Sequence, residues 1–123
     1  MKNVRCIDII KEYYDKYKFV LTNQNHCWAR ERLKQIGIPS YTLYLEDGWY
    51  VFALLHEIGH CEIFDGRYKQ STSEFLATQW AINNCKTYNV QLSEEQQNEW
   101  QEYIYSFCND KDKGKYKLDW RNM

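Results

Sequence analysis

Long hydrophobic runs are missing from this sequence. No apolar stretch approaches the roughly 20 residues of a membrane-spanning helix, and the chain opens on an amphipathic pattern without the apolar core of a secretory signal. Charge of one sign is missing as well, since 16 Lys and Arg residues are spread among 17 Asp and Glu residues. We therefore expect no membrane attachment, and no nucleic-acid partner of the kind that binds a basic stripe.

Paired cysteines are also missing. Five cysteines are scattered along the chain, at Cys6, Cys27, Cys61, Cys85 and Cys108. Their number is odd and no Cys-x-x-Cys pair occurs, which argues against a disulfide framework and against a thiolate zinc site. Reduced thiols are typical of the cytoplasm, so we expect a cytoplasmic protein. The length of 123 residues predicts one domain that spans residues 1–123.

The first half of the chain carries two helical patterns and one strand pattern. Apolar residues recur every three or four positions over residues 4–21, which predicts a helix with one buried face. A second helix is expected over about residues 26–36, because Gly37 ends it and Pro39 follows as a stop signal. Residues 40–45 alternate and contain aromatic side chains, which predicts the clearest strand of the chain.

The second half is predicted to be helical. Asp47 can cap a helix over about residues 49–63, and a further helix is expected over about residues 71–85. Ser93 opens a capping box for a last helix that ends near residue 108.

The C-terminal residues 110–123 are rich in charge, and we expect a loosely ordered tail there, although three large apolar side chains in it could dock. Taken together, the patterns predict a mostly helical α+β fold with about five helices. A small sheet or a single edge strand is expected beside the central helix.

The central helix carries His56, Glu57 and His60. Residues four apart on a helix point almost the same way, so both imidazoles can bind one metal ion. Glu57 is one position round the helix from His56, which puts its carboxylate near the metal but off the line of the ligands. A carboxylate in that place can accept a proton from a water molecule that the metal activates. The spacing predicts a catalytic zinc site, which needs a third protein ligand.

Glu74 is the predicted third ligand. It begins a face of small side chains on the next helix, made of Ala77, Thr78, Ala81 and Cys85. Small side chains let two helices approach closely, which a glutamate on one helix needs to reach a metal held by another. Glu74 could instead complete a capping box begun by Ser71. The rival ligands are Glu62, on the same helix as the histidines, and Asp65, in the following loop.

The segment from Leu54 to His60, followed by the segment from Glu74 to Ala81, resembles the gluzincin metallopeptidases. Among them it is most similar to the small ImmA/IrrE-type peptidases of phages and mobile elements, over residues 49–82. The resemblance implies a minimal zincin-like domain in which His56, His60 and Glu74 bind Zn²⁺ and Glu57 is the catalytic base. It also implies a protein or peptide substrate, such as a transcriptional repressor.

One position departs from the family pattern. Such families often carry an aspartate after the alanine of the Glu-x-x-Ala motif, as an outer-shell partner of a ligand histidine, and this chain has Thr78 instead. Outer-shell partners orient the ligand and raise its basicity, so the change puts metal affinity or rate in question. A hydroxyl can still form a hydrogen bond to the imidazole.

Other parts of the mechanism are open at this point. The oxyanion of peptide hydrolysis needs a further donor, for which Tyr44 and Tyr68 are candidates, and His26 is interpreted as a surface histidine. The strand predicted over residues 40–45 could bind an extended substrate by edge pairing. Two alternatives remain: another zinc amidohydrolase, such as a deformylase, and a non-catalytic zinc-binding interaction module.

Overall fold

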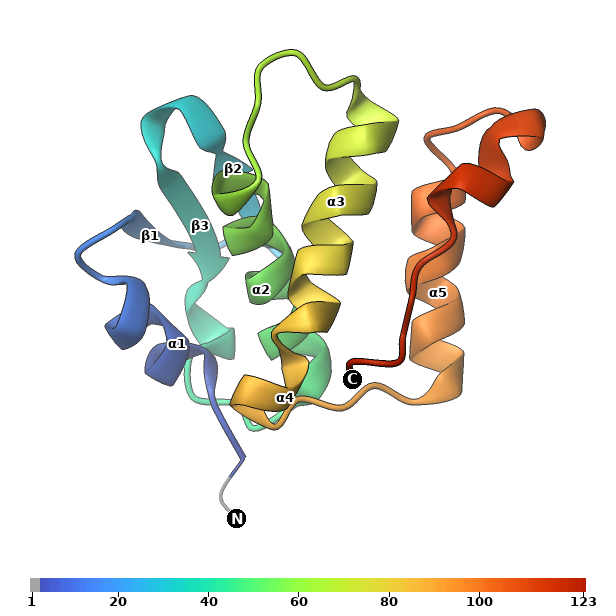
Figure 1. The fold of residues 1–123 in the computed structure, drawn as a ribbon. Coiled ribbons are helices and arrows are strands. Elements are labelled where there is room, and N and C mark those ends of the chain that lie inside the picture. Colours follow the sequence, from blue (N-terminus) through green and yellow to red (C-terminus); the bar gives the residue numbers. More distant parts are fainter. Residues whose placement is uncertain (1–2) are drawn as a thin grey trace.

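The computed structural model describes residues 3–123 and confirms a mostly helical α+β fold with a small sheet (Figure 1). The helices and strands are α1 (Cys6–Tyr13), β1 (Lys18–Thr22), β2 (Trp28–Arg30), β3 (Gln35–Pro39), α2 (Gly48–Glu62), α3 (Gln70–Asn83), α4 (Cys85–Tyr88) and α5 (Glu94–Tyr105). Short 3₁₀ helices are η1 (Glu31–Leu33), η2 (Ser40–Thr42) and η3 (Asp110–Tyr116). Figure 1 shows the sheet on one side of α2 and α3 on the other, with α5 beyond α3. No helix within residues 3–123 combines the length and hydropathy of a membrane crossing.

The sheet has the strand order β1-β3-β2. β3 is the central strand, parallel to β1 and antiparallel to β2. Ile36 and Ile38 of β3 are fully buried, as expected of a strand with neighbours on both sides. Because β2 pairs with β3 alone among the described strands, it is an edge strand, and it packs beside α2.

The structure corrects the predictions for the first half of the chain. The helix expected over residues 4–21 ends at Tyr13, and residues 18–22 form β1. The helix expected over residues 26–36 is replaced by β2, η1 and β3. Tertiary packing outweighs the helical period here, because the indole of Trp28 lies on Gly37, where a Cβ would come within 2.1 Å of the ring.

The strand predicted over residues 40–45 is wrong as well. Ser40–Thr42 forms a 3₁₀ turn, in which the Thr42 hydroxyl donates to the carbonyl of Pro39 at 2.8 Å. The aromatic residues of this segment, Tyr41 and Tyr44, are both exposed. They are therefore surface residues and do not form the buried face of a strand.

The three helices predicted in the second half are present as α2, α3 and α5. Asp47 caps α2 by accepting from the backbone N–H of Trp49 at 2.9 Å. Ser93 and Gln96 form the expected capping box of α5. The helix predicted from residue 71 begins at Gln70, with Lys69 at its N-cap and no side-chain cap.

The C-terminal segment is docked, which corrects the expectation of a loosely ordered tail. Gln101 of α5 binds the backbone of Tyr116 and Leu118, at 3.0 and 2.8 Å. Gln79 of α3 binds both backbone groups of Asp119, at 2.9 and 2.8 Å. Tyr116 and Leu118 are buried, so these amides hold a segment that also contributes to the core. Amide side chains that pair with a distant backbone leave no periodic pattern in a sequence.

The close crossing of α2 and α3 depends on Gly59. A Cβ at this position would lie 2.5 Å from the backbone carbonyl oxygen of Ala77. We therefore expect Gly59→Ala to force the helices apart and lower the melting temperature by about 5 to 10 °C, in spite of the better helix propensity of alanine. Circular dichroism melting measures this. Gly114→Ala is the matched control, because nothing lies within 4 Å of a Cβ there; equal melting temperatures for the two variants would contradict the crossing argument.

Candidate metal centre

Helix α2 brings His56 and His60 to one buried face. The two side chains are one helical turn apart, and the residues are only 3% and 4% exposed. Their Nε2 atoms face each other at 3.1 Å. The predicted pair of convergent imidazoles is therefore present.

Glu74 of α3 completes a triangle with these two nitrogens. Its Oε1 lies 3.1 Å from Nε2 of His56, and its Oε2 lies 3.1 Å from Nε2 of His60. Ligand atoms at the usual zinc distances on a tetrahedral ion are about 3.3 Å apart, so the triangle has the size that zinc requires. Because α3 begins at Gln70, Glu74 lies beyond the N-terminal cap and does not form the alternative capping box with Ser71.

Neither rival ligand reaches this centre. The carboxylate of Glu62 pairs with Lys16 at 2.6 Å and accepts from the hydroxyl of Tyr17. Asp65 pairs with Arg67 at 2.8 Å, in the loop between α2 and α3. Both acids thus have basic partners of their own, whereas Glu74 has the two histidines.

A hydrogen bond between Thr78 and Nδ1 of His56, on the side of the ring away from the Glu74 carboxylate, determines which ring nitrogen carries the proton. The hydroxyl of Thr78 donates its one hydrogen to the carbonyl of Glu74 at 2.8 Å. Toward Nδ1 of His56, at 2.9 Å, the same hydroxyl can therefore only accept. Nδ1 of His56 carries the proton, and its Nε2 presents a lone pair to the centre.

His60 has an equivalent outer contact. Its Nδ1 lies 3.2 Å from the hydroxyl of Ser73 and 3.6 Å from a carboxylate oxygen of Glu31 in η1. A carboxylate only accepts, so in one tautomer of His60 the proton on Nδ1 points toward Glu31 and Nε2 presents a lone pair; in the other tautomer Nε2 donates to Glu74 at 3.1 Å. In the first tautomer the three inward atoms, two imidazole nitrogens and a carboxylate oxygen, are all acceptors. A cation is the group that complements such a set.

The protonation equilibria of these groups follow from burial and from their mutual contacts. Burial lowers the pKa of His56. Burial also acts to lower the pKa of His60, but the hydrogen bond to Glu74 and the nearby carboxylates raise it overall. The pKa of Glu74 is well below its usual range: burial opposes this, and the hydrogen bonds and positive charge that both imidazoles offer when they are protonated outweigh burial. Glu74 is thus a carboxylate, as a metal ligand must be.

Glu57 lies beside the triangle and outside it. Its carboxylate oxygen is 3.8 Å from Nε2 of His56, and one possible ligand atom from each of His56, Glu57 and His60 lies within 4.8 Å of the others. Burial, with Glu74 and Glu31 nearby, raises the pKa of Glu57 to about 8. A nearby cation lowers such a pKa, so a bound metal favours the carboxylate form that can accept a proton.

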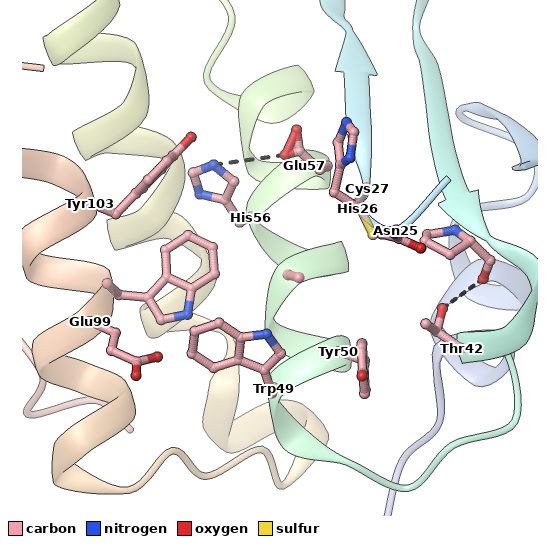
Figure 2. Close-up of a pocket in the computed structure, with 13 residues that line it drawn as sticks. Asn25, His26, Cys27, Thr42, Trp49, Tyr50, His56, Glu57, Glu99 and Tyr103 are labelled. Atoms are coloured by element: carbon pink, nitrogen blue, oxygen red, sulfur yellow. Dashed lines mark hydrogen bonds and ion pairs between the residues drawn. The ribbon is translucent and has the colours of Figure 1, made fainter. Parts of the chain in front are cut away.

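A pocket of about 530 Å³ opens next to the histidine face (Figure 2). One wall is α5, with Glu99, Trp100 and Tyr103, and the floor is the face of α2 that includes the half-buried Ala53 and the buried His56. The opposite wall is the segment that leads into β2, together with Pro39 and Thr42. The site is therefore accessible to a ligand from the side on which Glu57 lies.

Three contacts of the site were not predicted from the sequence. The hydroxyl of Tyr103 donates to Oε1 of Glu74 at 3.0 Å, and Ser73 and Glu31 contact His60. The expected tyrosines, Tyr44 and Tyr68, do not line the pocket. His26 is exposed, as expected, yet it does line the pocket. The only signal for Tyr103 is its position on α5 one turn from Trp100, which does not reveal where α5 packs.

Comparison of the chain with known protein families, with curated proteins and with solved structures gave no match.

Proposed function

We propose that this protein is a zinc-dependent metallopeptidase. The observation that carries the proposal is the triangle of inward-facing acceptor atoms from His56, His60 and Glu74, with the carboxylate of Glu57 beside it and a pocket in front of it. Two nitrogen ligands and one carboxylate are the ligand set of hydrolytic zinc sites, and they leave a fourth position open.

Each residue of the site has its own role in the proposed reaction. A zinc ion held by the triangle supplies Lewis acidity, which polarises a carbonyl and makes a water molecule more acidic. Glu57 accepts the proton of the attacking water and returns it to the leaving amine. The hydroxyl of Tyr103 is a donor that can turn from Glu74 to the oxyanion. Thr78 and Glu31 hold the ligand imidazoles in the tautomers that present Nε2 inward.

Peptide hydrolysis tests this function directly. We expect the purified protein to cleave a mixed peptide library, to lose the activity when a chelator removes the metal, and to regain it when zinc is added. Mass spectrometry of the products measures cleavage. A zinc-loaded, folded protein that cleaves no member of a broad library would instead support the non-catalytic interaction module.

We also propose that the chain belongs among the ImmA/IrrE-type peptidases and acts on a regulatory protein such as a transcriptional repressor. The motif residues support the first part, and the pocket beside an edge strand supports a protein substrate. An extended peptide can pair with β2, which replaces the segment 40–45 as the candidate for edge pairing. Incubation with a candidate repressor and sequencing of the fragments test the second part.

Thr78→Val should weaken zinc binding by about 10- to 100-fold, because it keeps the volume of the side chain and removes the acceptor of the Nδ1 proton of His56. Competition with a zinc chelator measures the affinity. Thr78→Ser keeps the hydroxyl and should bind zinc nearly as the parent does. Thr87→Val makes the same substitution at an exposed position and should leave the zinc affinity unchanged. Unchanged affinity in Thr78→Val would show that the hydroxyl does not orient the ligand.

Tyr103→Phe should lower kcat by about 10²-fold with little change in KM, since the lost hydroxyl serves the transition state more than the bound substrate. Zinc content should stay at the parental level. Steady-state kinetics on a peptide that the parent cleaves measures both constants. Tyr105→Phe, two residues along the same helix, should leave them unchanged; a Tyr103→Phe variant with parental kcat would remove this residue from the mechanism.

A further inference from the structure

The pocket continues beyond the metal centre along the first half of α2. Trp49, Tyr50 and Ala53 line it on the helix face that leads to His56. The eight residues from Trp49 to His56 span about 10 Å of helix, which is enough for the full length of a long side chain. Ala53 is the small residue in the middle of this face, so the hollow lies between the aromatic side chains on either side.

Aromatic rings form the walls of this part of the pocket. The rings of Trp49 and Trp100 lie 5.7 Å apart between centroids, so α2 and α5 each contribute an indole. Tyr50 lies on the other side of the floor (Figure 2). Such walls bind the apolar stem of a side chain, and their ring faces also attract a cation.

The charge in the pocket has one sign. Of its lining residues, Glu57 and Glu99 are acidic, and none is Lys or Arg. Figure 2 shows Glu99 toward the N-terminal end of α2, near Trp49 and away from Glu57. A ligand group at that end therefore meets an aromatic ring and a carboxylate without a basic residue of the pocket to compete for them.

We infer that this pocket binds a basic side chain, arginine or lysine, of a peptide next to the bond that the proposed enzyme cuts. The inference rests on the proposed function. The aliphatic stem of such a side chain lies along Ala53 between the rings, and its cationic end reaches Glu99 and the face of Trp49. An acidic side chain in the same place faces the carboxylate of Glu99, and an uncharged side chain leaves the interactions of Glu99 unused.

The test is calorimetric titration of the whole protein with hexapeptides that differ only at one central residue: arginine, lysine, norleucine or glutamate. We expect the arginine and lysine peptides to bind about tenfold more tightly than the norleucine peptide, which has the stem without the charge. The glutamate peptide should bind most weakly. Glu99→Gln should reduce the preference for arginine over norleucine about threefold to fivefold, as the loss of a partly exposed ion pair implies.

Glu102→Gln is the matched control, since this exposed acid lies on the same helix and does not line the pocket. Ala53→Leu should fill the hollow and weaken binding of the arginine and norleucine peptides alike. Equal affinity for arginine and norleucine, a preference that survives Glu99→Gln, or no binding of any peptide would overturn the inference. Mass spectrometry of the titrated samples reads cleavage separately, so peptides that bind with the expected preference and stay intact contradict the proposed enzyme and not the pocket.

Discussion

Replacing Glu57 with Gln is expected to reduce peptide hydrolysis by about 10²- to 10⁴-fold, because an amide cannot accept the proton of the attacking water. The fold and the bound zinc should be retained, since Glu57 lies outside the triangle made by His56, His60 and Glu74. Steady-state kinetics and metal analysis of the same preparation measure both quantities.

Glu62→Gln provides the control for Glu57→Gln. It removes a carboxylate from the same helix, but one that pairs with Lys16 and Tyr17, so it should affect stability slightly and the rate hardly at all. Parental activity in Glu57→Gln would mean that another group takes the proton, and the proposed division of roles would fail.

Replacing Glu74 with Ala should weaken zinc binding by more than about 100-fold, beyond the effect of losing an outer-shell partner. The variant loses one of three ligand atoms and also leaves a void between the two imidazoles. Chelator competition measures the affinity, and thermal melting of the metal-free protein measures the stability separately. The two measurements distinguish a ligand from a residue that only supports the helix.

Glu62→Ala and Asp65→Ala are the comparison variants for Glu74→Ala. Both acids were rivals for the third ligand, and both have basic partners away from the histidines, so zinc affinity should change little in either. If Glu74→Ala keeps parental affinity, the third ligand lies elsewhere and the gluzincin resemblance loses its second motif.

The site could be predicted from the sequence to the extent that it depends on local spacing. His56, Glu57 and His60 lie within one turn of a helix whose start is marked by Asp47, so helix geometry alone places them. Glu74 required one further step, the inference that small side chains let α3 approach α2. The structure adds that the approach also depends on Gly59 on α2, which lies against the backbone of Ala77 on α3.

The parts of the fold and of the site that the sequence does not predict depend on contacts between distant segments. β2 has only three residues, and its pairing with β3 is stabilised by packing of Trp28 on Gly37, which no periodicity in the sequence reports. Tyr103 reaches Glu74 because α5 packs at the edge of the site, 29 residues further along the chain. Neither contact has a local pattern, so the sequence predicts the strands at the wrong residues and does not indicate that Tyr103, rather than Tyr44 or Tyr68, lines the pocket.

The aromatic surroundings of His56 connect the core to the site. Trp100 lies 5.0 Å from the His56 ring and 5.0 Å from the Phe52 ring, between centroids. The same indole thus packs on the hydrophobic core, supports the imidazole of His56 and lines the pocket. A rigid support of this kind keeps the position of the imidazole constant, which the proposed metal centre would need.

The most direct measurement is the zinc content of the folded protein, determined by native mass spectrometry after reconstitution with zinc and removal of excess metal. We expect one zinc ion per chain, and none in a variant that carries both His56→Ala and His60→Ala and that circular dichroism shows to be folded. A folded parental chain that retains no zinc, or a double variant that retains as much as the parent, would contradict the metal centre.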